Sequence, residues 1–167
     1  IKPVWIELGL QTIHPHTADY IRRGYPLSVY DTAVCELHER GIEAITHVIL
    51  GLPGETTDDM QATADYIAHQ PIQGVKFQLL HVLKGTDLYT DYLGQSFHTL
   101  TLDEYTDILI RCIELMPPEM VIHRITGDGP KNILAAPDWS RNKKQVLNHI
   151  HHCMKIRNTW QGRCYLQ

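Results

Sequence analysis

The stretch IEAITHVILGLPGE, residues 42–55, decides the fold class of this chain of 167 residues. Residues 42–50 are mostly apolar or β-branched, which is typical of a strand buried on both faces of a sheet. Gly51 and Gly54 follow, and glycine lets the backbone turn sharply or approach a flat ligand closely. The GK[ST] sequence of a phosphate-binding loop does not occur here. The stretch alone therefore predicts a small-ligand site at the rim of a parallel sheet.

Strands and helices alternate along the rest of the chain. Strands are expected at 4–8, 42–50, 74–83 and 120–125. Helices are expected at 15–23, at 28–40, from Thr56 or Thr57 to Pro71, from Thr101 to Pro117, and at 140–157. Buried strands joined by helical crossovers form a parallel α/β sheet, in which ligands bind beyond the carboxyl ends of the strands.

Two short sequences match the capping box that begins many helices, a hydroxyl residue followed three positions later by an acidic one. Thr101-Leu-Asp-Glu104 matches it fully, and Ser28-Val-Tyr-Asp31 matches it with Asp in place of Glu. We expect Thr101 and Ser28 to be helix N-caps.

Composition indicates an ordinary globular protein, with 43% hydrophobic and 20% charged residues. No run of 18 apolar residues occurs, so no membrane span is expected. Cysteines stand at positions 35, 112, 153 and 164 without CxxC spacing, which favours a reducing cytoplasm over a disulfide framework. The sequence starts without Met inside an expected strand, which indicates a piece of a longer protein.

Charge is distributed unevenly. Residues 1–122 carry 7 Lys/Arg and 17 Asp/Glu, whereas residues 123–167 carry 8 Lys/Arg and 2 Asp. The basic C-terminal segment suits a polyanion such as RNA. A solvated helix face that offsets the acidic body explains the same charges, and charge alone favours this second explanation.

Polar side chains occur where the first strand ends. Gln11 offers two donors and one acceptor, which suit the hydroxyl pair of a sugar. Arg23 ends the next expected helix and can bind a carboxylate through two N–H groups, although a cation at a helix C-terminus is the simpler explanation. Glu7 lies within the strand, where a carboxylate needs a partner.

The second and third strands add a mixed set of side chains. By period-two alternation His47, Ile49 and Gly51 share one face, and an imidazole beside an aliphatic wall suits a nucleoside. Leu80 and His81 stand near the end of the third strand on opposite faces. When His47 is taken alone, a core histidine bonded to a backbone carbonyl is the better explanation.

The cluster HIHHC, residues 149–153, invites a metal interpretation. Only neighbours three or four residues apart share a helix face, so His149 meets His152 or Cys153 but not the whole set. These are too few ligands for a closed zinc site, and no metal site is predicted in this chain.

Together the motifs resemble the radical S-adenosylmethionine (SAM) superfamily. HVILGLPGE (47–55) matches its GxIxGxxGE motif, with His47 in place of the first glycine. ELGLQT (7–12) is similar to the ribose-side motif of the superfamily. VKFQLLHVLKGTDLY (75–89) resembles the sixth barrel strand of the branch that includes the catalytic subunit of Elongator. Nearly the whole chain, through HRITGDGPK and TWQG, resembles the bacterial YhcC/YtqA type.

The resemblance implies roles for the polar residues named above. Gln11 and His47 would contact the ribose of SAM, and Arg23 would hold its methionyl carboxylate. Glu7 and His81 are weaker candidates for contacts to SAM.

It also implies roles for three apolar positions and for the fold. Ile49 and Leu80 would bracket adenine, and Gly51 would let the backbone come close. The fold would be the C-terminal half of a partial (β/α)6 TIM-like barrel with mostly parallel strands and crossover helices. Residues 1–129 would form this half-barrel, and residues 130–167 a basic helical extension.

Members of the superfamily hold a [4Fe–4S] cluster on three closely spaced cysteines in an early loop. With an electron from a donor, the cluster cleaves SAM to methionine and a 5′-deoxyadenosyl radical. That cysteine loop does not occur in this sequence. The resemblance therefore implies an iron–sulfur enzyme in the full-length form and an inactive chain by itself, and the substrate cannot be read from the residues.

Two functions of other classes stay open. One is a noncatalytic module that binds a nucleotide or RNA through the basic segment, and the other is a scaffold that only binds partners. A sheet edge left open also predicts a dimer of this chain by edge pairing.

Overall fold

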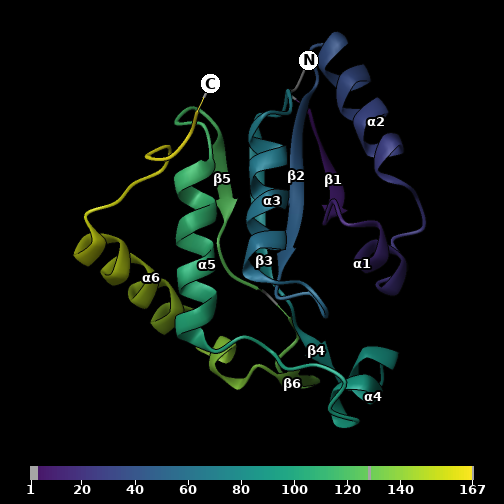
Figure 1. Ribbon diagram of the computed structural model, residues 1–167, viewed down its shortest axis with the longest axis vertical. Helices are drawn as coiled ribbons and strands as arrows, with labels where there is room; N and C mark the ends of the chain where they lie inside the picture. Colours follow the sequence, from purple (N-terminus) through teal and green to yellow (C-terminus); the bar gives the residue numbers. More distant parts are fainter. Residues whose placement is uncertain (1–3, 128, 167) are drawn as a thin grey trace.

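The computed structural model describes residues 4–127 and 129–166. The predicted domains 1–129 and 130–167 include residues 1–3, 128 and 167, which lie outside the described residues. The main sheet has four parallel strands in the order β1-β2-β3-β5 (Figure 1). Their bounds are β1 Trp5–Gln11, β2 Glu43–Leu50, β3 Gly74–Leu79 and β5 Val121–Arg124.

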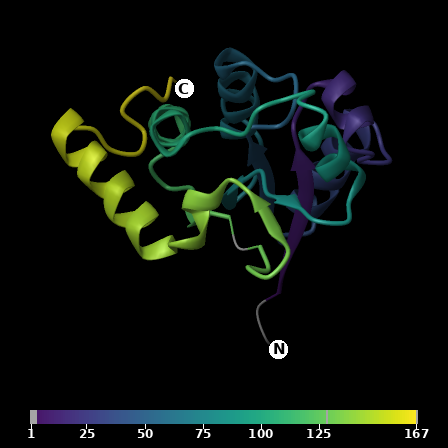
Figure 2. The same ribbon diagram turned by 90° about the horizontal axis from the view of Figure 1, so that it is seen from below.

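Helices connect successive strands of the sheet. They are α1 Pro15–Tyr20, α2 Leu27–Glu39, α3 Thr57–Ala68 and α5 Leu102–Leu115. After the sheet come the 3-10 helix η1 (Asp138–Arg141) and α6 (Lys143–Arg157). Seen from below, α6 extends away from the sheet beyond α5 (Figure 2). The predicted α/β fold, with parallel strands and crossover helices, is confirmed.

The core lies between the sheet and its helices. Alternate residues of β3, such as Phe77, are fully buried against Ile67 of α3 and Leu109 of α5. Burial of each such side chain stabilises the fold by about 1.5–3 kcal/mol. The other face of the sheet, here called the inner face, carries polar side chains at its centre: Glu7, His47, Lys76 and Gln78.

A small second sheet lies at the carboxyl end of the main sheet. It pairs β4 (Val82–Leu83) with β6 (Leu134–Ala136) in antiparallel orientation, and α4 (Asp87–Leu93) lies beside it (Figure 1). The expectation of one strand over 74–83 is therefore wrong. The strand ends at Leu79, and Val82 then turns to pair with Ala136.

The structure confirms one of the two predicted capping boxes and not the other. The box at Thr101 is confirmed, since its hydroxyl accepts from the Glu104 N–H and Glu104 accepts from the Thr101 N–H. The box at Ser28 is wrong, because α2 begins at Leu27 with Pro26 as its N-cap. Pro26 is extended, as an N-cap residue should be, so the helix starts two residues earlier than predicted and Ser28 falls in its first turn.

Candidate functional site

A groove of about 790 Å³ opens at the carboxyl end of the main sheet, here called the carboxyl-edge groove. A volume of this size suits a cofactor-sized ligand. Four of the predicted site residues line it together: Gln11, Arg23, Ile49 and Leu80. The other lining residues come from β1, the segment after α1, the loop after β2, and α4: Gly9, Tyr20, Ile21, Arg22, Tyr25, Leu52, Thr86, Asp87, Leu88 and Asp91.

Gln11 has an unusual conformation at the end of β1. Its φ of 66° lies in the left-handed region, which is strained for a residue other than glycine. The side-chain amide folds back over Gly9, where a Cβ would lie 2.8 Å from Gln11 Nε2. The Oε1 atom of Gln11 is buried and accepts no hydrogen bond within the described residues. An orphaned buried acceptor costs about 1–3 kcal/mol, so a ligand that donates to it would recover that energy.

Arg23 lies on the same side of the groove and grips the end of β1. Its Nη1 donates to the carbonyls of Leu10 and Thr12 at 3.1 and 2.6 Å, and its Nε donates to the Tyr25 carbonyl at 3.0 Å. The guanidinium also lies 5.0 Å from the centre of the Tyr25 ring. Since α1 ends at Tyr20, the alternative explanation of Arg23 as a helix C-terminal cation is wrong. These bonds use Nε and Nη1, which leaves the Nη2 amine for a ligand.

The opposite wall of the groove is apolar. Leu80 is 7% exposed and continues the ladder of the sheet, donating from its N–H to the Leu50 carbonyl at 3.0 Å. Leu80 and Leu52 belong to a second apolar cluster with Val82 and Phe97, against which Ile49 packs. The groove therefore combines an apolar part of its lining with a polar part.

Two rim contacts cross the mouth of the groove between the α1 segment and α4. The Tyr20 hydroxyl donates to Asp91 at 2.7 Å, and Arg22 Nη2 donates to Asp87 at 2.6 Å. Desolvation, followed by the Asp91 carboxylate, raises the pKa of Tyr20 to about 12. Sequence patterns give no signal for these pairs, because each joins residues that only the tertiary fold brings together. Gly9, in contrast, was detectable from its period-two spacing to Gln11.

Glu7 and His47, predicted as SAM contacts, lie outside the groove lining and bind each other on the inner face. His47 Nε2 lies 2.7 Å from Glu7 Oε2, and Lys76 Nζ donates to the same oxygen at 2.5 Å. Gln78 Nε2 lies 3.1 Å from His47 Nδ1. The bond from Lys76, then the one from His47, lowers the pKa of Glu7 to about 2. This carboxylate on a strand thus has a histidine and a lysine as partners, although it stays in contact with solvent.

Gly51 and His81 also lie outside the groove lining. Gly51 turns the chain after β2 with a φ of 88°, and a Cβ there would lie 3.0 Å from Leu100 Cδ1. His81 is half-buried and packs on the backbone of Gly127 and Gly129, where added Cβ atoms would collide with its ring. The predicted contacts of Glu7, His47, Gly51 and His81 with SAM stay predictions.

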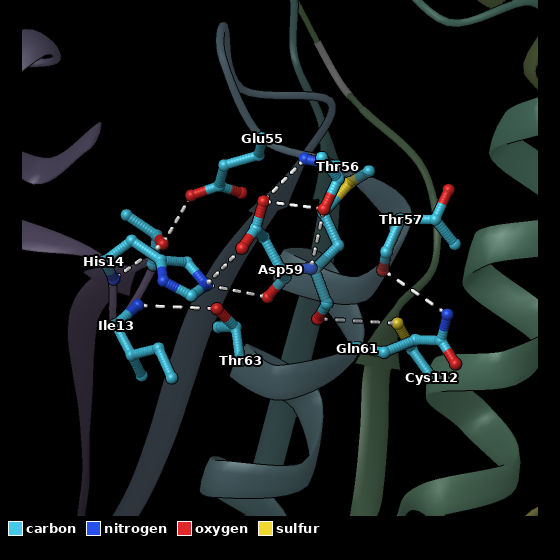
Figure 3. Close-up of polar contacts among 11 residues, drawn as sticks. Ile13, His14, Glu55, Thr56, Thr57, Asp59, Gln61, Thr63 and Cys112 are labelled. Atoms are coloured by element: carbon cyan, nitrogen blue, oxygen red, sulfur yellow. Dashed lines mark hydrogen bonds and ion pairs between the residues drawn. The ribbon is translucent and has the colours of Figure 1, made fainter. Parts of the chain in front are cut away.

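A polar cluster ties the loop after β1 to the start of α3 (Figure 3). The Thr12 hydroxyl donates to Glu55 Oε1 at 2.5 Å and accepts from the His14 N–H at 3.1 Å. His14 Nε2 lies 2.9 Å from the Asp59 carbonyl, and the Ile13 N–H donates to the Thr63 hydroxyl at 3.4 Å. Burial, opposed by the Thr12 bond, raises the pKa of Glu55.

Metal-binding side chains are sparse. Within residues 4–127 and 129–166 no group of three or more His, Cys, Asp or Glu side chains could hold a metal ion. His149 Nε2 lies 3.7 Å from Cys153 Sγ and 3.0 Å from Asp103 Oδ1. The cysteines over the same ranges are free, so the residues present do not fit a [4Fe–4S] cluster.

In the described part of the chain, none of the helices has the length and apolar character needed to cross a membrane.

Known proteins share both the sequence and the fold. YtqA, an uncharacterized protein of Bacillus subtilis, is 41% identical over 97% of this chain and 50% of its own length. A tRNA uridine(34) acetyltransferase of Dehalococcoides mccartyi is 26% identical over 91% of this chain and 35% of its own length. A solved structure of Methanocaldococcus infernus Elp3 with an N-terminal deletion has a TM-score of 0.83 at 20% identity, over 95% of this chain and 37% of that one.

Family models cover most of the sequence. Residues 1–67 match the model described as the Radical SAM superfamily, and residues 72–156 match the Radical SAM C-terminal domain. The chain spans about half the length of YtqA, its 41% identical relative. The resemblance of the motifs is thereby confirmed, and the chain belongs to the radical SAM superfamily.

Proposed function

We propose that the carboxyl-edge groove is part of a SAM pocket. The orphaned Oε1 of Gln11 carries the proposal, because a buried acceptor at a ligand-sized groove indicates a donor that the ligand supplies. The apolar side chains of Ile49 and Leu80 suit a purine. The guanidinium group of Arg23 suits a carboxylate. SAM combines all three chemical groups.

Each lining residue then has one role. Gln11 Oε1 accepts from a ribose hydroxyl, and Gly9 makes room for the amide that holds Gln11 in place. The Nη2 amine of Arg23 donates to the methionyl carboxylate. Ile49 and Leu80 bracket adenine between two aliphatic side chains, and they exclude water from it.

In our proposal Glu7 and His47 hold β1 and β2 in place next to the pocket. By strand alternation they precede the groove residues Gly9 and Ile49 by two positions on the same face. Their mutual hydrogen bond and the one from Lys76 fix the side chains of three neighbouring strands. Gly51 and His81 affect the pocket indirectly in our proposal, because they shape the turns that follow β2 and β3.

The proposed activity is that of a longer protein. Residues 1–129 form part of its barrel and residues 130–167 extend it; bound to a reduced [4Fe–4S] cluster, SAM would supply a 5′-deoxyadenosyl radical. The cluster ligands and the electron donor belong to parts outside this chain. No step of that chemistry is assigned to residues of this chain beyond binding and orienting SAM. The cytoplasm and the edge-paired dimer stay predictions.

RNA is the proposed substrate class for the whole enzyme. Lys144 and Lys155 project from α6 as exposed cations, and one relative is named as a tRNA-modifying enzyme. Fewer cations of residues 123–167 are available to RNA than their number indicates, because some are paired with carboxylates. Arg141 is bonded to Asp138, and Arg157 is bonded to Asp107.

One experiment tests the SAM pocket. Full-length protein is reconstituted with iron and sulfide, SAM binding is measured by equilibrium dialysis, and 5′-deoxyadenosine is measured after reduction. We expect binding and product in the wild type, and at least about tenfold weaker binding in Gln11→Ala, since one charge-free hydrogen bond and its desolvation are lost. Wild-type protein that carries the cluster but does not bind SAM would contradict the proposal.

A further inference from the structure

We propose that Glu55 is a positioning residue for the carboxyl-edge groove and acts on it through the hydroxyl of Thr12. The inference rests on the proposed function, because the groove that Glu55 positions is the proposed SAM pocket. Glu55 itself does not line the groove.

The contact between the two residues joins loops of neighbouring strands. Thr12 is fully buried directly after β1, and its hydroxyl donates to Glu55 Oε1 at 2.5 Å. Glu55 stands in the loop between β2 and α3. The carboxylate therefore fixes the end of β1 relative to the end of β2, which are the strands that supply Gln11 and Ile49 to the groove.

The position of Thr12 affects Gln11 and Arg23, the two groove residues proposed to bind polar groups of SAM. It directly follows Gln11, whose φ of 66° is strained and must be held by its surroundings. The Thr12 carbonyl accepts from Arg23 Nη1 at 2.6 Å, so a shift of Thr12 would move the guanidinium as well. One residue outside the groove thus controls the placement of two residues that line it.

The cluster around Glu55 is built to hold this loop (Figure 3). The Thr12 hydroxyl also accepts from the His14 N–H, while the Ile13 N–H donates to Thr63 of α3. His14 lies against the first turn of α3, 2.9 Å from the Asp59 carbonyl. The buried Thr12 hydroxyl thus accepts one hydrogen bond from the backbone and donates its own to Glu55.

The role requires a hydrogen-bond acceptor at residue 55 and does not require a charge. A glutamine keeps the Oε1 acceptor at nearly the same place, whereas an alanine removes it. At residue 12, serine keeps the hydroxyl, whereas valine keeps the shape and removes the hydroxyl. These four substitutions separate the hydrogen bond from charge and from packing.

The test uses full-length reconstituted protein and measures the dissociation constant of SAM. We expect Glu55→Ala and Thr12→Val each to weaken SAM binding about tenfold, and Glu55→Gln and Thr12→Ser to stay within about threefold of the wild type. Because the two residues act through one bond, the double variant Thr12→Val/Glu55→Ala should bind no more weakly than either single variant. Equal losses in the conservative variants, or additive losses in the double variant, would overturn the proposal.

A matched control uses the Thr101–Glu104 pair, which is also a threonine hydroxyl bonded to a glutamate, at the start of α5. Thr101→Val and Glu104→Ala should lower the unfolding temperature as much as the Glu55 variant or more, with SAM affinity unchanged. If they weaken SAM binding equally, the effect of Glu55 is one of general stability and the proposal fails.

A second readout does not depend on SAM. Hydrogen exchange measured by mass spectrometry should show faster exchange over residues 9–14 in Glu55→Ala and Thr12→Val, and unchanged exchange there in Thr101→Val. Unchanged exchange in the first two variants would overturn the positioning role. Faster exchange in a protein that does not bind SAM would uphold the positioning role and reject only the proposed function.

Discussion

Lys76 Nζ lies 2.5 Å from Oε2 of Glu7, and the same carboxylate binds His47, so one carboxylate links the three adjacent strands β1, β2 and β3. Since Lys76 is 17% exposed and Glu7 is 35% exposed, the pair is partly shielded from solvent. It is therefore stronger than an exposed surface pair, although solvent still screens it.

The pH dependence of stability should report on this pair. The pKa of Glu7 is lowered from 4.5 to about 2, first by the bond from Lys76. A lowered pKa stabilises the fold above the unfolded value, and this contribution is lost as pH falls from about 4.5 toward 2. We expect Glu7→Gln to unfold at a lower temperature than wild type at pH 7, and the difference to shrink at pH 3. A difference that stays constant with pH would contradict this, as measured by circular dichroism.

Gly9→Ala should weaken SAM binding while leaving the fold intact. A Cβ at residue 9 would lie 2.8 Å from Gln11 Nε2, so the amide must leave its place over the strand. We expect about tenfold weaker SAM binding in full-length protein, by equilibrium dialysis. Gly94→Ala is the control, because its nearest atoms lie at an ordinary 3.5 Å. Similar losses in both variants would contradict a role of Gly9 in holding the Gln11 amide.

Removing the two rim contacts should speed ligand release with little effect on stability. Arg22 and Asp87 are 77% and 76% exposed, and such pairs contribute about 0–1 kcal/mol. In Asp87→Ala/Asp91→Ala we expect SAM to dissociate several-fold faster, by stopped-flow displacement. Arg40→Gln, which breaks an exposed pair with Glu36 on α2, should leave the rate unchanged.

The phenol of Tyr20 provides an independent check on the rim. Desolvation and Asp91 raise its pKa to about 12, so replacing Asp91 with asparagine should lower the pKa toward 10. Ultraviolet titration of wild type and Asp91→Asn, each compared with its Tyr20→Phe counterpart, measures this shift. An identical tyrosine titration in both pairs would show that the contact is absent in solution.

RNA binding should depend on the exposed lysines of α6. Each lysine that contacts a phosphate of a single strand contributes about 0.7 to the slope of log K against log salt. Lys144→Gln/Lys155→Gln should therefore bind RNA more weakly and reduce the slope by about 1.4. Lys84→Gln, an exposed lysine on another part of the chain, is the control. An unchanged slope in the double variant would remove α6 as the RNA surface.

The main sheet could be predicted because its pattern is local. Val75, Phe77 and Leu79 alternate with less buried residues, and Thr101 with Glu104 marks the start of α5 without help from tertiary contacts. The motif residues at the strand ends were located by the same logic. Four of the eight predicted site residues line one groove because the carboxyl ends of parallel strands meet at one edge.

The remaining features depend on contacts between distant residues. Residues 74–83 are apolar enough to suggest one strand, and only the pairing of Val82 with Ala136 separates β4 from β3. The helix α4 is short and fully buries none of its residues, since Leu88, Tyr89 and Tyr92 are only partly covered by the second apolar cluster. The bond between Glu7 and His47 could not be predicted either, because it joins two strands and neither strand's sequence pattern indicates the partner. This bond competes with any ligand for the two side chains.

The packing of His81 on two glycines has a consequence for how relatives diverge. A side chain at either glycine would occupy the space of the imidazole ring, so Gly127 and Gly129 depend on what stands at residue 81. Lineages that keep a large ring there should inherit both glycines with it. Lineages that replace His81 with a small residue are free to lose them, and an alignment should show the three positions changing as one unit.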